Sequence, residues 1–129
     1  MVRGKERGQK DIKEGIGKAA LIARLAAEKK AENTIILRMG ELTSFTDYFV
    51  ICSGTSTTHA RTIADFVLEE TKKKGLRPSG LEGLSGARWV LLDYGDVVVH
   101  IFETGTRQFY GLEKLWLDAP RVTAPAGKT

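Results

Sequence analysis

This 129-residue sequence contains one cysteine and two histidines, the residue types that thiolate catalysis or a zinc site would need. To act as a thiolate nucleophile, Cys52 would need an imidazole beside it, from His59 or His100. However, Cys52 lies in the middle of an apolar run of strand length, where a thiol is usually a small core residue. Three candidate ligands spread along the chain do not predict a zinc site either. We therefore expect no catalytic thiol and no bound metal.

A turn with the sequence Ser-Gly-Thr-Ser, residues 53–56, is the nearest approach to a phosphate-binding loop. It precedes a predicted helix, whose N-terminus could hold an anion, although strand–turn–helix junctions often have this composition for geometric reasons. Nucleotidyl transfer would also need two acids on one strand face to hold magnesium. Asp93 and Asp96 lie three residues apart across a turn, so they do not form such a pair. We expect no enzyme and no cofactor, and a nucleotide-binding enzyme that uses residues 53–56 is the weakest alternative.

The length and composition predict one globular domain with its own core. The chain has a mass of 14.2 kDa, with 42% hydrophobic and 28% charged residues, which is ordinary for a folded soluble protein. Its longest apolar runs are too short to span a membrane, and residues 1–15 carry charges of both signs, unlike a signal peptide. A single cysteine fits a reducing compartment. We expect a cytoplasmic protein with no membrane partner.

The net charge of +4 is unevenly distributed along the chain. Residues 1–30 hold nine basic and four acidic side chains, whereas residues 31–129 hold 11 basic and 12 acidic ones. Residues 81–118 alone hold three basic and six acidic side chains. A protein that binds nucleic acid with its body would have the opposite distribution. Apart from a basic N-terminal arm that could touch RNA, the charges favour a basic protein partner.

The apolar pattern predicts the order α-β-β-α-(β)-β-β-α, and hence an α/β domain with a mixed sheet and helices packed on it. Helices are expected over residues 11–30, 57–74 and 106–117. Strands are expected over residues 34–39, 47–53, 88–94 and 97–103, with a short edge strand at 76–77. Phe109 and Trp116 fall on the apolar stripe of the last helix, which predicts that both are buried. Pro120 and Pro125 are expected to end regular structure.

A tight turn at Gly95-Asp96 decides which residues share each face of the last two strands. It places one all-apolar set on the core side: Val90, Leu92, Tyr94, Val97, Val99 and Ile101. The opposite side carries the six candidate partner-binding residues: Trp89, Leu91, Asp93, Val98, His100 and Phe102. An apolar face with one acid and one imidazole is typical of a protein-binding patch. A covering helix would explain the same pattern equally well.

Three segments of the chain carry a resemblance to a known family. They are residues 47–70 (DYFVICSGTSTTHARTIADFVLEE), 89–102 (WVLLDYGDVVVHIF) and 107–122 (RQFYGLEKLWLDAPRV). In this order they resemble the bacterial ribosomal silencing factors, the iojap-like family, and the similarity runs from about residue 17 to residue 122. The resemblance implies a compact α/β domain with nucleotidyltransferase-like topology and no transferase activity. We expect this domain over residues 11–122, with a mobile basic tail over 1–10 and a flexible tail over 123–129.

The resemblance also implies a translational repressor. Family members bind the large ribosomal subunit through its basic fourteenth protein and block joining with the small subunit, which lowers translation when nutrients are scarce. On this basis Trp89 would be the central anchor, while Leu91, Val98 and Phe102 complete an apolar floor and Asp93 and His100 make polar contacts or orient neighbours. The last motif adds further contact candidates: Arg107, Tyr110, Glu113 and Trp116. A large-subunit assembly factor is the alternative function, and an exposed apolar sheet face also allows a homodimer in the free state.

Overall fold

A mixed sheet of six strands forms the centre of the protein, whose computed structural model describes residues 15–122. In the order β3-β4-β5-β2-β1-β6, the strands are β3 (Gly80–Glu82), β4 (Trp89–Asp93), β5 (Val97–Glu103), β2 (Tyr48–Gly54), β1 (Glu32–Arg38) and β6 (Arg121–Val122). Only β2 and β5 run parallel; the other neighbouring pairs are antiparallel. The predicted α/β fold with a mixed sheet is thus confirmed. The tails predicted at residues 1–10 and 123–129 lie outside the described residues.

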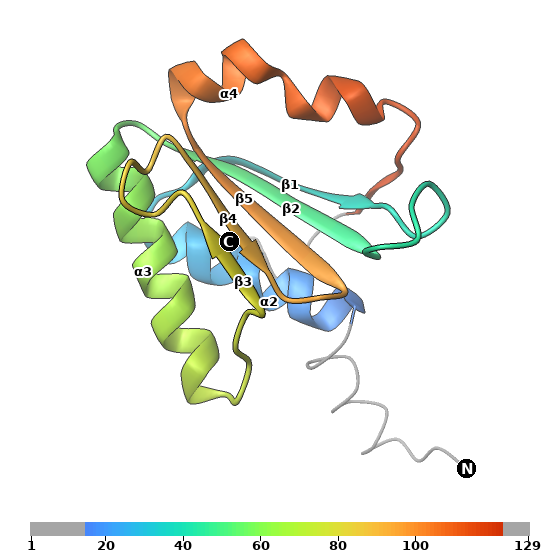
Figure 1. Ribbon diagram of the computed structural model, residues 1–129, viewed down its shortest axis with the longest axis horizontal. Helices are drawn as coiled ribbons and strands as arrows, with labels where there is room; N and C mark the ends of the chain where they lie inside the picture. Colours follow the sequence, from blue (N-terminus) through green and yellow to red (C-terminus); the bar gives the residue numbers. More distant parts are fainter. Residues whose placement is uncertain (1–14, 123–129) are drawn as a thin grey trace.

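Helices α2 (Gly15–Glu28) and α3 (Thr57–Lys73) pack side by side on one face of the sheet (Figure 1). The predicted core side of the last two strands faces them, and all six of its residues are buried. Strand β2 is buried on both faces because it is central, as its continuous apolar run predicted. Of the first predicted helix, the segment from residue 15 to 28 is helical and residues 11–14 lie outside the described part.

Helix α3 follows the prediction closely because its local signals agree. The Ser56 side chain accepts a hydrogen bond from the His59 backbone N–H and caps the N-terminus. Its residues at helical spacing form a buried stripe of Ala60, Ile63, Ala64, Val67 and Thr71, with Leu68 half-buried beside it. Gly75, at a φ of +81°, follows the end of the helix in the left-handed conformation that glycine adopts without strain.

The turn between β4 and β5 also anchors the start of α2. The Asp96 carboxylate accepts hydrogen bonds from the Gly15 backbone N–H and from Lys18 Nζ, both at 2.7 Å. An acceptor at the N-terminus of a helix satisfies a backbone donor that has no partner within the helix. Asp96 therefore holds α2 against the hairpin.

The chain after β5 differs from the prediction. Helix α4 (Thr104–Tyr110) ends at Gly111, which has a φ of +56°, and a 3₁₀-helix, η1 (Leu112–Trp116), follows it. The single helix expected over residues 106–117 is thus wrong, because the left-handed Gly111 breaks the helical path. The expected edge strand at residues 76–77 is also wrong; the edge strand is β3. Regular structure does not end at Pro120, since β6 follows it and pairs with β1.

Candidate protein-binding site

The six candidate residues lie on one side of the β4–β5 hairpin, opposite the face that packs on α2 and α3. Trp89 stands across from Phe102, Leu91 across from His100, and Asp93 across from Val98. The predicted register is therefore confirmed. The segment formed by α4 and η1 lies over this side of the sheet (Figure 1).

The two strands differ in how much of this side they expose. On β5, Val98, His100 and Phe102 are buried, with exposed fractions of 7%, 4% and 0%. The covering helix explains these values, because α4 packs on β5 and β2. On β4, which is nearer the sheet edge, Trp89, Leu91 and Asp93 are only half-buried. The β4 side chains are therefore the accessible part of this face, and the buried β5 side chains lie beside them on the adjacent strand.

Trp89 is held in a fixed orientation by the side chains around it. Its indole Nε1 donates a hydrogen bond to His100 Nδ1 at 3.1 Å. Its ring centroid lies 4.8 Å from that of Phe102 and 5.0 Å from that of Tyr110. Aromatic rings at these distances attract one another, so these contacts hold the half-buried indole in one orientation.

The imidazole of His100 is neutral in the folded protein. Because Nδ1 accepts the bond from Trp89, the ring proton resides on Nε2. Burial lowers the pKa of His100 from 6.5 to about 4, since a charged ring would be poorly solvated there. His100 thus serves as a hydrogen-bond acceptor that orients Trp89.

Four exposed apolar or aromatic side chains lie on the segment over this side of the sheet, and one of them, Tyr110, lies against Trp89. We call them the α4–η1 patch: Phe109, Tyr110, Leu115 and Leu117, exposed to 81%, 54%, 72% and 81%. The prediction that Phe109 is buried is wrong, because Arg107 occupies the inward face of α4 and Phe109, two positions later, points away from it. Large exposed apolar side chains gathered on one segment mark a site of protein interaction.

Local polar contacts set the position of this segment. Glu103 caps α4 by accepting hydrogen bonds from the backbone N–H groups of Gly105 and Thr106, and these bonds lower its pKa. The guanidinium of Arg107 bonds to the Glu113 carboxylate at 3.1 Å and to Ser53 Oγ at 2.9 Å. Arg107 therefore ties α4 both to η1 and to the sheet. Burial would raise the pKa of Glu113, but its own backbone N–H and the guanidinium of Arg107 favour the carboxylate and bring the pKa below its usual value.

Two surface pockets border the α4–η1 patch. One, of about 430 Å³, lies between Trp89 and α4 and is lined by Arg88, Glu103, Phe109 and Tyr110 among others. The other, of about 420 Å³, is lined by residues that include Leu42 of the β1–β2 loop together with Leu115 and Leu117. Concave features beside exposed aromatic side chains give a partner's side chains places to anchor.

Only two of the six acids in residues 81–118 are neutralised by an ion pair with a described residue. Asp96 and Glu113 are paired with Lys18 and Arg107. The remaining acids of that segment form no ion pair with any described residue: Glu82, Asp93, Glu103 and Asp118. Asp93 lies on the candidate face itself and accepts a hydrogen bond from the Gly95 backbone N–H. Asp93 thus places one carboxylate without an ion-pair partner among the described residues on the candidate face.

The residues considered for catalysis, Cys52 and His59, are buried in the core or hydrogen-bonded to the backbone. Cys52 is fully buried, and burial raises the pKa of its thiol to about 12, which disfavours a thiolate. His59 Nδ1 accepts from the Thr55 backbone N–H at 2.8 Å, and its Nε2 lies 2.7 Å from the Lys29 carbonyl oxygen. In the turn at residues 53–56, the backbone N–H of Thr55 is therefore already bonded to a side chain of α3, the helix that follows the turn.

Two further observations concern metals and membranes. Within residues 15–122, no three histidine, cysteine, aspartate or glutamate side chains gather closely enough to hold a metal ion. None of the helices described in that range combines the length and apolar character needed to cross a membrane.

Comparison with known proteins identifies similar sequences and folds. The family described as "Ribosomal silencing factor during starvation" matches residues 11–129. A ribosomal silencing factor from Halalkalibacterium halodurans is 44% identical over 95 residues, covering 74% of this chain and 81% of that protein. A mouse protein named "Mitochondrial assembly of ribosomal large subunit protein 1" is 31% identical over 99 residues, covering 74% of this chain and 43% of its own.

Solved structures share the fold. A Bacillus halodurans protein superimposes with a TM-score of 0.70 at 40% identity, covering 82% of this chain and 94% of that one. A Chromobacterium violaceum protein gives a TM-score of 0.75 at 29% identity, with coverages of 88% and 94%.

Proposed function

Since this chain belongs to the ribosomal silencing factor family, we propose that it binds the large ribosomal subunit and prevents the small subunit from joining. The partner is a basic protein of the large subunit, expected from the family to be its fourteenth. Joining takes place in the cytoplasm, and the repressor acts there when nutrients are limiting.

The half-exposed Trp89 beside the α4–η1 patch is the observation that carries this proposal. Interface energy concentrates on a few aromatic anchors surrounded by apolar contacts. Trp89, oriented by His100, is such an anchor, and Leu91 lies beside it on the same face. Val98 and Phe102 provide the floor beneath them.

The charge on this side of the protein favours a basic partner. Asp93 lies on the face, and Asp118 lies just beyond η1. Acidic groups at the rim of an interface raise the rate of encounter with a basic protein and disfavour acidic partners. We infer that they set the orientation of binding, while the apolar centre supplies most of the affinity.

The proposed mechanism is steric and needs no chemical step. A bound domain of 14.2 kDa on the joining face of the large subunit occupies space that the small subunit requires. Inhibition is then stoichiometric, with one factor for each large subunit.

Sedimentation of mixed subunits tests this proposal. Salt-washed large subunits are incubated with the protein, small subunits are added, and the fraction of joined ribosomes is measured on a sucrose gradient. The wild-type protein should reduce joining in proportion to its occupancy. Trp89→Ala should weaken binding at least about 30-fold, which corresponds to the 2 kcal/mol or more that an aromatic anchor commonly contributes.

Two further variants separate a binding defect from a folding defect. Phe109→Ser changes a side chain that is 81% exposed, so it should weaken binding without lowering the thermal midpoint. Leu81→Ser is the matched control, because Leu81 is also exposed, to 44%. It is the cross-strand neighbour of Leu92, so its side chain lies on the face of the sheet opposite the candidate site. If wild-type protein leaves joining unchanged, the repressor proposal is wrong. If Leu81→Ser is as defective as Phe109→Ser, the binding face is misassigned.

A role in assembly of the large subunit is the second candidate function. The mouse relative's name refers to assembly of the mitochondrial large subunit, and an assembly factor could use the same face. Preferential binding to immature large subunits, with little effect on joining of mature ones, would favour it.

A homodimer in the free state is also proposed from the exposed α4–η1 patch. Burying these apolar side chains against a second copy removes them from water when no ribosome is present. Light scattering should then show a mass that rises from 14.2 kDa towards twice that value with concentration. Phe109→Ser should remain monomeric.

A further inference from the structure

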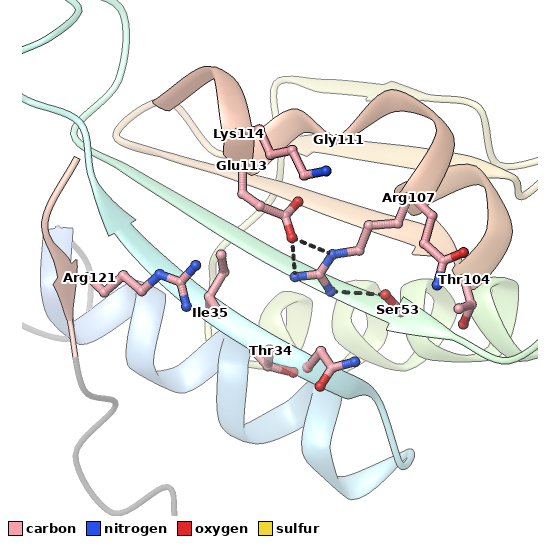
Figure 2. Close-up of a pocket in the computed structure, with 11 residues that line it drawn as sticks. Thr34, Ile35, Ser53, Thr104, Arg107, Gly111, Glu113, Lys114 and Arg121 are labelled. Atoms are coloured by element: carbon pink, nitrogen blue, oxygen red, sulfur yellow. Dashed lines mark hydrogen bonds and ion pairs between the residues drawn. The ribbon is translucent and has the colours of Figure 1, made fainter. Parts of the chain in front are cut away.

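A third pocket, of about 560 Å³, lies between the sheet and the α4–η1 segment (Figure 2) and shares only Lys114 with the pocket beside Leu115 and Leu117. It is bounded by the start of β1, the end of β2, and the α4–η1 segment. Its volume falls in the range of sites that hold a cofactor or metabolite. Neither Trp89 nor any member of the α4–η1 patch lines it.

The position of this pocket in the sheet is one that favours ligand binding. Ser53 and Thr104 bring to it the carboxyl ends of β2 and β5, the two parallel strands. After these strands the chain departs in opposite directions, because β2 leads to α3 below the sheet and β5 leads to α4 above it (Figure 1). In open α/β sheets, ligands bind in the crevice that such a divergence leaves outside the strand ends.

The charges that line the pocket favour an anion. Three cationic side chains from three different elements surround it, Arg107 of α4, Lys114 of η1 and Arg121 of β6 (Figure 2). Glu113 is the one acid among the lining residues, so the lining has an excess of two positive charges. A phosphate monoester carries nearly that charge at neutral pH.

Arg107 retains donors for a ligand although it is 92% buried, with an exposed fraction of 8%. Its Nε donates to Glu113 Oε2 and its Nη1 donates to Ser53 Oγ, while its Nη2 forms an ion pair with the same Glu113 oxygen at 3.1 Å. A guanidinium has five N–H donors, so two remain without a partner among residues 15–122. Its fork geometry suits two oxygens of one phosphate group.

We propose that this pocket binds a small phosphorylated molecule of nucleotide size, whose phosphate is held by Arg107, Lys114 and Arg121. The polar side chains of Thr34 and Gln108 line the same pocket and can bond to the hydroxyl or amide groups of the remaining part. A half-open pocket of this volume, bounded by the sheet and the α4–η1 segment, suits a small molecule better than a continuous RNA backbone, which runs along an extended groove. Nucleotides and sugar phosphates share this chemistry, and the experiment distinguishes them.

Titration of the full chain, followed by backbone-amide NMR shifts, tests this proposal. The probes are ADP, ribose 5-phosphate and inorganic pyrophosphate, with uncharged adenosine as the reference. At least one of the first two should bind saturably at submillimolar concentration, and it should shift the amides of Thr34, Ser53 and Gln108. Adenosine should bind at least tenfold more weakly. Tighter binding of ADP would indicate a nucleotide, and equal binding of ribose 5-phosphate would indicate a sugar phosphate.

Exposed cations provide variants that leave the fold intact. Lys114→Gln and Arg121→Gln should each weaken binding about two- to fivefold, the usual effect of removing one exposed charge. Lys72→Gln, an exposed lysine on α3, should leave it unchanged. Equal weakening by Lys72→Gln, binding of pyrophosphate alone, shifts spread over the whole chain, or binding of a short RNA but of neither small phosphate would each overturn the proposal.

Discussion

Acidification from pH 7 to pH 5 is expected to destabilise this protein through His100. The ring is 4% exposed, and its Nδ1 accepts the hydrogen bond from Trp89 Nε1. Its Nε2 is buried without a hydrogen-bond partner among the described residues. Protonating the ring would turn the acceptor into a second donor facing the indole N–H, and would place a charge where burial solvates it poorly.

The size of the effect follows from the difference in pKa between the two states. His100 has a pKa of about 4 in the folded protein against 6.5 for an exposed histidine. Between these values the unfolded chain binds more protons than the folded one, so the free energy of unfolding decreases as the pH falls. The whole shift corresponds to about 3 kcal/mol, of which about 2 kcal/mol is lost between pH 7 and pH 5.

Urea unfolding of the wild type and of His100→Gln at both pH values measures this term. Glutamine does not titrate, and its Oε1 can accept the hydrogen bond from Trp89. Titration of all other groups is common to both proteins and cancels when they are compared. The stability of the wild type relative to the variant should therefore fall by about 2 kcal/mol at pH 5. A relative stability that stays within about 0.5 kcal/mol would refute a neutral, buried His100.

Three further predictions concern the core and its anchors. A Cβ at Gly54 would lie 2.6 Å from a backbone nitrogen of α3, so Gly54→Ala should lower the free energy of unfolding, measured by urea titration, by about 2 kcal/mol. A Cβ at Gly86 would meet no atom within 4 Å, so the control Gly86→Ala should change this free energy by less than about 0.5 kcal/mol. Asp96→Ala removes the acceptor for the first amide of α2 and for Lys18 Nζ, and should cost about 2 kcal/mol in the same assay; an unchanged urea midpoint would contradict the anchoring role. Cys52, buried and with its pKa raised to about 12, should react with a thiol reagent only as fast as the chain unfolds, and rapid labelling of the native protein would contradict this.

The elements that the sequence predicts best are those whose signals are local. Gly95 and the alternating pattern on either side of it specify the hairpin and its register without reference to the rest of the chain. Ser56 and Gly75 mark the two ends of α3, and its apolar stripe marks its buried face. In these segments local preference and tertiary packing agree, so pattern reasoning succeeds.

The elements that escaped prediction depend on contacts between distant residues. β6 has two residues, and it is a strand because Arg121 and Val122 pair with β1 some 85 positions earlier. The break at Gly111 is favoured by Arg107, which bonds both to Glu113 and to Ser53 on β2. A glycine within an apolar helical pattern was the one local signal for this break. Periodicity alone assigned Phe109 to the buried stripe, whereas Arg107 is the residue of α4 that is buried.

For the same reason, the face of the candidate site could be predicted but its exposure could not. Strand alternation determines which side chains share a face, whereas exposure depends on which other segment packs over it. Here α4 covers β5 and leaves β4 accessible. Each interpretation of the hairpin pattern therefore holds for one strand. The side chains of β5 are covered by a helix, and those of β4 are half-exposed and accessible.

The α4–η1 segment links the two sites proposed above. Its outward side carries Phe109 and Leu117, whereas its inward side carries the pair of Arg107 and Glu113. This pair lies largely out of water, with the two side chains exposed to 10% and 24%, so loss of either partner would leave a poorly solvated charge and loosen the segment. A phosphate bound against Arg107 would add a contact from the sheet to the same segment. The position of the α4–η1 patch thus depends on the ion pair of Arg107 and Glu113 on the inward side of the segment. A change in this pair would therefore alter how the proposed partner is bound.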